Sequence, residues 1–442
     1  MMTVANKAKY ERQRDARTAR YELWFPMVLF GSMGAITWAI RGTGGWGGVD
    51  GTMVPGMTFG LLWYYLCHRK GIDARGIPLW LGLGVAIGGE LGYGQYVSWI
   101  QGKFSVGDTT IPVAPWIGYT WFVICGIGWA GPGGIALGWA LEGTVSRRRW
   151  LVRLLVPLGV GFLAWLLVQT YPALFFPNYG LNLYASDLDK HLLRTVETNT
   201  KNFVVAAWWL GALIAAAVQR DRSTLTMGAL LGGGFGIGFA LAATWCLGYT
   251  YAPGYIDWWK MWELNAGFNL GVLYVIALYW ATRRINNPPE PTLPPNLVER
   301  RRTIALVVAV GLLMFITFLG ASYNTGVLLG FYTESDVNQY AWPLARVALF
   351  APVGVAILGV MAFKMRRIII LSRTPTWRSV EDPHLPERMA DLMTVLGVVG
   401  AATIWPHKIG VLYALFLCFA IFALNRLNRH YDDLDFRNER AG

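Results

Sequence analysis

Long, almost uncharged runs of apolar residues recur along the chain and constrain its fold more than any other feature. Many of these runs are 16 to 28 residues long, and about 20 helical residues are enough to cross a hydrocarbon core roughly 30 Å thick. Charged residues make up 14% of the sequence, whereas soluble globular proteins contain about 25%. The sequence therefore predicts an all-α, polytopic integral membrane protein, because a soluble fold would have to bury every run at once.

Twelve membrane-spanning helices are predicted, each separated from the next by a charged or proline-rich connector. They lie near residues 24–41, 53–67, 78–99, 116–143, 150–170, 203–219, 226–248, 261–282, 303–322, 343–363, 389–404 and 409–425. The chain is accordingly divided into a basic tail (1–22), helices one to eight (23–282, with an outer loop at 171–202), a proline-rich linker (283–302), helices nine to twelve (303–425) and a second tail (426–442).

The distribution of basic residues predicts how these helices are oriented in the membrane. When both termini are placed in the cytoplasm, 30 of the 38 lysines and arginines fall in the tails and loops on that side, as expected for membrane proteins. The net charge of +12 is therefore interpreted as a topology and lipid-headgroup signal, not a nucleic-acid surface. We expect a multi-pass protein of a bacterial inner (plasma) membrane, with the lipid bilayer and a small solute as its partners.

A short glycine element recurs and predicts repeated, tightly packed helical hairpins. The pattern Gly-x-x-Φ-Gly, where Φ is Leu or Phe, occurs at 56–60, 134–138 and 267–271. Small residues four apart let helix backbones approach closely, which favours helix association in lipid. Packing is the simplest interpretation of any one of these glycines.

Glycine and proline also predict interruptions of the helices beside these elements. The segment 41–52 (RGTGGWGGVDGT) is half glycine, residues 130–133 read AGPG, and 263–266 (ELNA) is a milder case. Irregular backbone inside a membrane is tolerated where it is buried in protein or lines a wet cavity, and breaks in related helices often mark a solute site. Arg41 adds a positive charge to the first segment; the alternative is a tight outer hairpin with a snorkelling arginine.

Ionisable residues inside predicted spans are candidate site residues, because they are costly to place there. Glu90, in GGELGYG, is the only carboxylate predicted at the bilayer midplane, as a ligand group, a proton carrier or half of an ion pair. Arg41 and Arg346, near outer helix ends, are its possible partners. Lys260 and Glu142 lie near span ends, where snorkelling explains them.

Polar and aromatic residues beside the interruptions complete the candidate set. Glu263, Asn265 and Asn269 form a polar stripe on one predicted helix, and Trp46 and Trp129 flank the breaks, where they could stack on a planar solute. Asp50 and Glu263 are the best available constellation for catalysis. The cysteines and histidines show no metal-ligand spacing, so neither a metal nor a cofactor is expected.

Three functions are compatible with this pattern, and we favour the first. It is a transporter or permease for a small polar, possibly anionic solute, with its site near the midplane at Arg41, Trp46, Asp50, Glu90, Trp129, Glu263, Asn265, Asn269 and Arg346. The alternatives are a membrane-embedded enzyme acting on a lipid-linked substrate and a non-catalytic scaffold subunit. We expect the protein not to be an enzyme, and neither its substrate nor its oligomeric state follows from the sequence.

Overall fold

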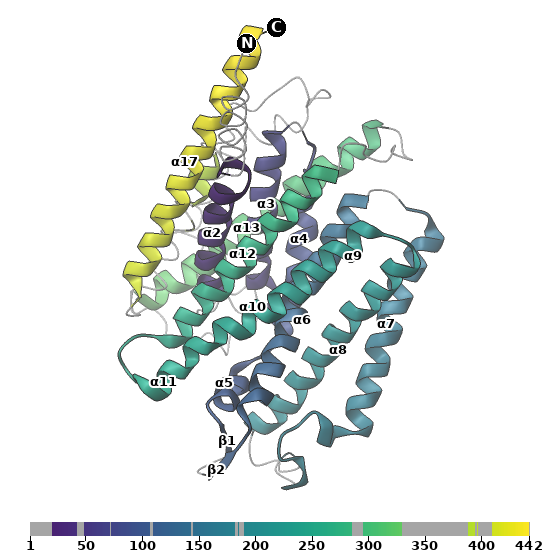
Figure 1. Ribbon diagram of the computed structural model, residues 1–442, viewed down its shortest axis with the longest axis vertical. Coiled ribbons are helices and arrows are strands. Elements are labelled where there is room, and N and C mark those ends of the chain that lie inside the picture. The colour runs from purple at the N-terminus through teal and green to yellow at the C-terminus, as the bar shows by residue number, and fades with distance from the viewer. Residues whose placement is uncertain are drawn as a thin grey trace, which may run out of the picture.

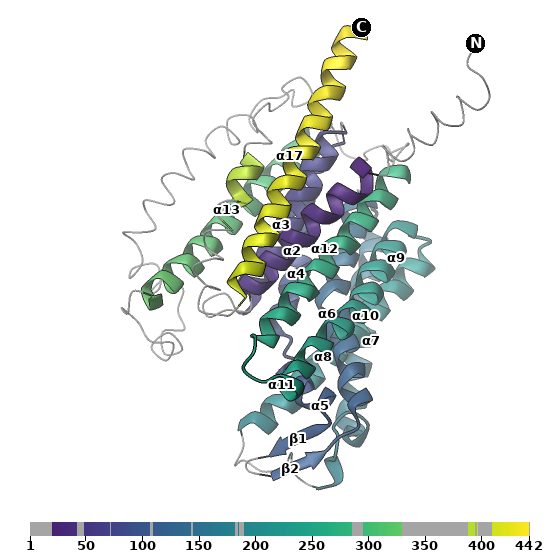
Figure 2. The same ribbon diagram turned by 60° about the vertical axis from the view of Figure 1, so that its left-hand side comes forward.

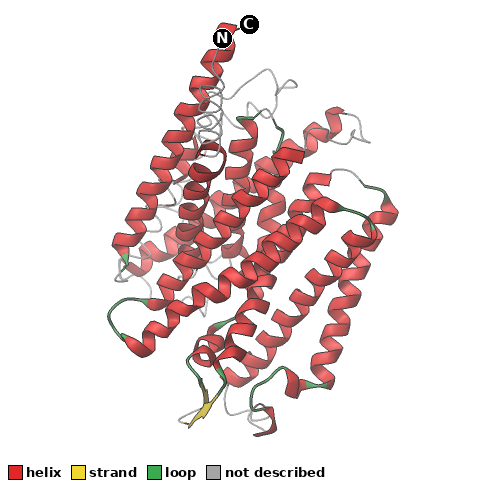
Figure 3. Cartoon of the chain, in the orientation of Figure 1, coloured by secondary structure: helices red, strands yellow, loops and turns green. Residues whose placement is uncertain are grey.

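The described residues form a bundle of long helices with one small sheet at one end (Figure 1 and Figure 3). The computed structural model describes residues 20–41, 48–70, 72–106, 109–142, 145–181, 184, 190–284, 295–328, 388–393, 396 and 409–441. The main helices in chain order are α2 (Phe25–Arg41), α3 (Gly48–His68), α4 (Ile77–Ala86), α5 (Gly94–Ile100), α6 (Pro115–Glu142), α7 (Arg147–Thr170), α8 (Lys190–Val218), α9 (Arg222–Gly228), α10 (Gly234–Ala243), α11 (Gly248–Tyr251), α12 (Trp258–Arg284), α13 (Pro295–Leu328) and α17 (Gly410–Ala441).

Short helical turns and two strands complete the elements. The turns are η1 (Arg20–Trp24), η2 (Ile87–Glu90), η3 (Pro172–Leu174), η4 (Tyr179–Leu181), η6 (Ala229–Gly233) and η7 (Thr244–Leu247). Strands β1 (Lys103–Val106) and β2 (Thr109–Pro112) pair antiparallel, with Lys103 opposite Pro112.

The chain is an all-α, multi-pass membrane protein. Within the described part, seven helical segments are long and apolar enough to cross a bilayer. They are Arg20–Arg41, Pro115–Glu142, Arg147–Thr170, Thr195–Val218, Arg222–Tyr251, Trp258–Thr282 and Gly410–Asp433. Each of the seven overlaps one predicted span.

The other predicted spans have different outcomes. Spans 53–67 and 303–322 lie within the longer helices α3 and α13. Span 343–363 lies outside the described residues, as does most of 389–404.

The first described residues and the end of α17 lie at the same end of the bundle (Figure 2). The rings of Tyr21 and His430 stack there, with centroids 3.8 Å apart. Ion pairs join the helices at this end: Arg69 contacts Asp432 at 3.2 Å, and Asp73 contacts both Arg75 (3.0 Å) and Arg302 (3.1 Å). We call it the basic end.

Asp73 joins the loop between α3 and α4 to α13. Burial alone would raise the pKa of this carboxyl, but hydrogen bonds from Arg75 and the charges of Arg75 and Arg302 outweigh burial and lower the pKa. Arg75 also donates a hydrogen bond of 2.7 Å to the hydroxyl of Thr303 on α13. This network fixes α13 to the rest of the bundle.

The recurrent glycine elements lie where helix backbones touch. A Cβ on Gly34 of α2 would overlap the carbonyl oxygen of Gly267 on α12, and one on Gly267 would overlap that of Gly34. On α6, a Cβ on Gly134 would come within 2.6 Å of the backbone oxygen of Met227 on α9. Glycine is needed at these crossings because a side chain would separate the helices.

Two of the three predicted helix interruptions are absent. α6 runs without a break through 130–133 and α12 through 263–266, so these two predictions are wrong. In α6 the proline removes one backbone hydrogen bond, but tertiary packing on both sides keeps the helix intact. Of the predicted interruption at 41–52, residues 42–47 lie outside the described residues. The third predicted span breaks unexpectedly, because residues 91–93 are not helical between η2 and α5. The glycines of GGELGYG weaken the helix there.

Candidate functional site

Arg41 is the last residue of α2, and its guanidinium group is buried among aromatic rings. Its central carbon lies 4.4 Å from the ring centroid of Trp129, 5.5 Å from that of Trp38 and 5.6 Å from that of Tyr93. Such cation–π contacts stabilise an arginine away from water. Arg41 is thus the last residue of its own span, Arg20–Arg41, and it lies beside the middle of the longer helix α6.

The break at 91–93 brings Tyr93 to Arg41. Nη2 of Arg41 donates a hydrogen bond to the hydroxyl oxygen of Tyr93. The Tyr93 ring lies 4.7 Å from the ring of Trp262 and 5.7 Å from that of Trp259, both on α12. If the predicted span 78–99 were one continuous helix, Tyr93 would not be directed toward Arg41. We use the name Arg41 cluster for Trp38, Arg41, Tyr93, Trp129 and Trp262.

The Arg41 cluster contains buried N–H donors without acceptors. Nε of Arg41 and the indole nitrogens of Trp38 and Trp262 have no hydrogen-bond partner. The indole N–H of Trp129 faces the sulfur of Cys125, which is a weak acceptor. Among the described residues, the other buried indole without an acceptor is that of Trp99. Buried polar groups are almost always satisfied by protein, water or an ion. Three unsatisfied donors in one cluster therefore indicate a site for an acceptor.

Arg41 also lacks a counter-charge within the described part of the chain, where no carboxylate lies within ion-pair distance of it. A buried arginine without a carboxylate is unfavourable, because desolvation of the charge is not offset by an ion pair. The hydrogen bond to Tyr93 and the contacts with the aromatic ring faces offset only part of this desolvation cost.

A buried ion pair lies beside the cluster, at the beginning of α12. Nζ of Lys260 is 2.6 Å from Oε2 of Glu263, and both side chains are almost fully buried. Oε1 of Glu263 accepts a hydrogen bond of 2.9 Å from Trp259, and Lys260 donates one of 3.2 Å to the carbonyl oxygen of Ala39 on α2. This pair links α12 to the end of α2, and its own charges cancel.

Glu90 lies apart from the Arg41 cluster. Its neighbour Gly88 packs against Trp129, so Glu90 is close to the same height in the bundle. Its side chain is nevertheless 58% exposed and points away, to Nζ of Lys201 at 3.1 Å. Lys201 also contacts Glu197, at 2.8 Å. Arg41 is therefore not its partner.

The remaining predicted site residues are scattered. Asn269 donates a hydrogen bond of 3.0 Å to the carbonyl oxygen of Gly238, which joins α12 to α10. Asn265 is half-buried on α12. Asp50 lies in the first turn of α3 with its side chain outside the described part, and both Trp46 and Arg346 fall outside the described residues.

Sequence reasoning missed three contributors to this region. Neither Tyr93 nor Trp38 stands out among the many aromatic residues of the sequence. Lys260 was explained by snorkelling, but it is buried with Glu263. The three-residue spacing of Lys260 and Glu263 was the available signal, because residues three apart share a helix face.

The residues that the structure describes contain no group of three His, Cys, Asp or Glu side chains suited to a metal ion. Comparison of the chain with protein families, with curated proteins and with solved structures finds no match.

Proposed function

We propose that this protein is a membrane permease for a small anion, which binds at the Arg41 cluster. The observation that carries the proposal is a buried cation that has no carboxylate among the described residues and that lies beside N–H donors without acceptors. An anion supplies both missing parts: a negative charge for Arg41 and acceptor lone pairs for the indole and guanidinium N–H groups. A cation or a neutral donor would satisfy neither.

The position of the cluster supports transport better than a purely structural role. Arg41 is buried between membrane-spanning helices beside the middle of α6, and charged groups buried inside a membrane protein often mark a solute or ion pathway. Two helical segments stop beside it, since α2 ends at Arg41 and η2 ends at Glu90. Interrupted helices at mid-depth are the usual setting of solute sites in transporters.

We retain twelve spans, repeated hairpins, cytoplasmic termini and a bacterial inner membrane as parts of this proposal. Their support is the concentration of basic side chains in the tails and alternate loops. The packing of all three glycine elements against neighbouring helices is compatible with repeated hairpins.

Anion flux into proteoliposomes tests the proposal. Vesicles with valinomycin and a protonophore are mixed with potassium chloride, nitrate, formate or phosphate, and swelling is followed by stopped-flow light scattering. We expect at least one of these anions to enter faster than in empty vesicles. Arg41→Gln should reduce that rate at least about tenfold, because the charged partner of the anion is lost, and Arg41→Lys should restore part of it.

Arg222→Gln is the matched control, because Arg222 is exposed at the basic end. An equal loss of anion flux in Arg222→Gln would mean that replacement of any arginine slows the flux, so the effect at Arg41 would not be specific. If no anion enters faster than in empty vesicles, or if folded Arg41→Gln keeps the full rate, the proposal is wrong. A scaffold subunit then becomes the better hypothesis.

The enzyme alternative is less well supported. Both oxygens of Glu263 are already bonded, to Trp259 and Lys260, which makes this carboxylate a poor general base. Turnover of a lipid-linked substrate that is abolished by Asp50→Asn and Glu263→Gln, with anion flux unchanged, would reverse this ranking.

A further inference from the structure

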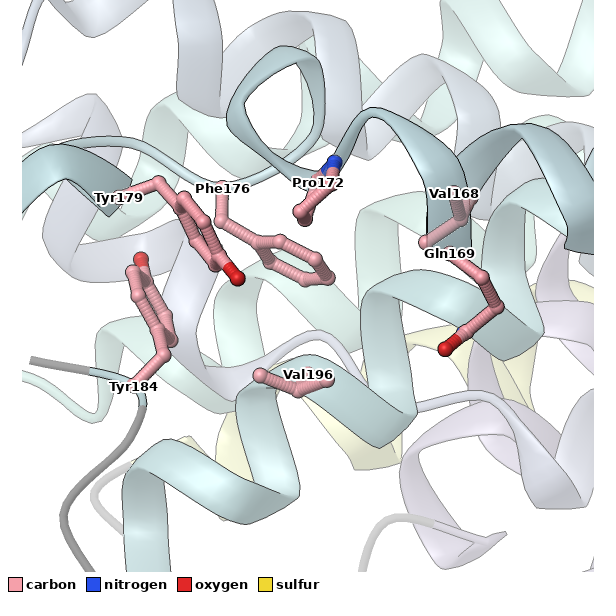
Figure 4. Close-up of a pocket in the computed structure, with 7 residues that line it drawn as sticks. All are labelled: Val168, Gln169, Pro172, Phe176, Tyr179, Tyr184 and Val196. Atoms are coloured by element: carbon pink, nitrogen blue, oxygen red, sulfur yellow. The ribbon is translucent and has the colours of Figure 1, made fainter. Parts of the chain in front are cut away.

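A separate cavity of about 200 Å³ lies between the ends of α7 and α8 that are far from the basic end (Figure 1), and Figure 4 shows the residues that line it. Val168 and Gln169 come from the last turn of α7, Val196 comes from α8, and the other lining residues come from the segment that follows α7. The corresponding membrane spans end at Thr170 and begin at Thr195. The cavity therefore lies at the level where the membrane-spanning parts of these helices end.

Three aromatic rings form one side of this cavity. The ring centroids of Phe176 and Tyr184 are 5.3 Å apart, those of Tyr179 and Tyr184 are 5.9 Å apart, and Phe176 and Tyr179 are 6.1 Å apart. Tyr184 also stacks on Phe104 of β1, at 5.7 Å. Its hydroxyl donates a hydrogen bond of 2.8 Å to the carbonyl oxygen of Pro177. The aromatic wall is thus held in place before any ligand binds.

The polar groups of the cavity are all neutral. Gln169 contributes an amide, and Tyr179 and Tyr184 contribute hydroxyls. Burial raises the pKa of Tyr184 above its usual range, so this phenol stays protonated. The Tyr184 hydroxyl donates its proton to the carbonyl oxygen of Pro177, so toward a ligand it can act only as an acceptor. The Gln169 amide can both donate and accept hydrogen bonds.

These features select the chemistry of the ligand. Neutral walls disfavour an ion, and a mixture of donors and acceptors disfavours a plain alkyl chain or a quinone ring, which carries acceptors only. A sugar ring presents hydroxyls of both kinds together with a face of C–H groups that packs on aromatic rings. The volume is below the roughly 300–1,000 Å³ of sites for drug-sized ligands, which limits the ligand to about one ring.

We propose that this cavity binds one neutral sugar ring, either as free sugar or as the headgroup of a glycolipid. Exposed Tyr171 and Leu174 beside the cavity are placed to contact lipid, which suits a ligand that is itself anchored in the membrane. This site is independent of the anion permease proposed above.

Saturation-transfer difference NMR tests this proposal on the full chain in phosphatidylcholine nanodiscs. Purification must avoid glucoside and maltoside detergents, because their headgroups would compete. Methyl β-glucoside is titrated directly, and it is then displaced by monoglucosyl diacylglycerol added to the nanodisc. We expect saturation transfer to the C–H face of the sugar. Gln169→Leu and Tyr179→Phe should each weaken binding about tenfold through lost hydrogen bonds.

Tyr255→Phe is the matched control, because Tyr255 is exposed in the loop after α11, and it should leave binding unchanged. Thermal unfolding confirms that the variants are folded. Binding of both ligands at one site, or of the glycolipid alone, supports the proposal and identifies the source of the sugar. The proposal is overturned if neither ligand binds, if folded Gln169→Leu and Tyr179→Phe bind normally, or if diacylglycerol without sugar or decylubiquinone competes equally well.

Discussion

Two buried arginines, Arg41 and Arg153, have similar surroundings but opposite electrostatic situations. Both are almost fully buried, and both lie against tryptophan rings; Arg153 is 5.3 Å from the centroid of Trp150 and 5.8 Å from that of Trp139. Arg153 contacts the carboxylates of Asp221, at 2.8 Å, and Glu142, whereas Arg41 has no carboxylate among the described residues.

The difference separates a structural arginine from a candidate binding arginine. Arg153 joins α6, α7 and the start of α9, where Asp221 also caps the helix by accepting a hydrogen bond of 2.9 Å from the backbone of Thr224. Two nitrogens of Arg153 lack acceptors too, so unsatisfied N–H groups alone do not distinguish the two residues. The distinguishing feature is that Arg41 has no carboxylate partner in the part of the chain that the structure describes.

Replacement of each arginine by methionine is the strongest test of this comparison. Arg153→Met leaves Asp221 buried without its cation, so the free energy of unfolding should fall by about 3–5 kcal/mol. Arg41→Met removes a charge that has no counter-ion and should change stability by less than about 1 kcal/mol, or increase it. Unfolding in mixed micelles measures both. Equal losses would show that Arg41 has a structural acceptor.

The Lys260–Glu263 pair extends the comparison to a second buried carboxylate. Glu263→Gln should reduce the free energy of unfolding by about 3 kcal/mol, because it leaves Lys260 charged and buried. In the double variant Lys260→Met with Glu263→Gln, most of that loss should disappear. A double variant as unstable as the single one would contradict this expectation.

The close approach of α2 and α12 also holds Arg41 in place. Gly34→Ala should cost about 1–3 kcal/mol of stability, since the added methyl group meets the backbone of Gly267, and it should slow anion flux by displacing Arg41. Gly159→Ala is the control, because nothing lies within 4 Å of a Cβ at that position on α7. Helix stability at Gly159 should improve slightly.

Replacement of Asp73 should have the smallest effect on stability, and it tests how stability depends on pH. The folded pKa of Asp73 is lower than the ordinary value of about 3.8, so its contribution is complete above that value and is lost as pH falls through the folded pKa. Asp73→Asn should reduce stability at neutral pH by about 1.5 kcal/mol, the contribution of a charge-assisted hydrogen bond. The variant should also show less loss of stability on acidification. Unchanged acid sensitivity would assign that sensitivity to other carboxylates.

The length and composition of the apolar runs were sufficient to predict the membrane class and most described helices. α2, α6, α7 and α12 begin and end within a few residues of the predicted spans, because a run of that length can satisfy its backbone in lipid only as a helix. The start of α8 at Lys190, well before the predicted residue 203, shows that a helix can continue beyond the membrane into a polar segment.

Positions of the helix breaks depended on tertiary contacts. Pro132 looked like a break but lies inside a continuous helix, whereas residues 91–93 are not helical and direct Tyr93 to Arg41. Helix propensity measures only the free energy that a residue costs when it lies in a helix. The surrounding tertiary packing determines whether the helix forms in spite of that cost.

The apolar runs are enough to predict a helical membrane protein, and the spacing of the glycines is enough to predict close helix contacts. The sequence also shows a charged residue, Arg41, beside a glycine-rich segment. The partners of the charged residues depend on the packing of the helices: Glu90 contacts Lys201, Glu263 contacts Lys260, and Arg41 contacts three aromatic rings and no carboxylate of the described residues. The physical reason is that a residue type sets the cost of burying a charge, whereas the arrangement of helices sets which opposite charge comes close enough to offset it.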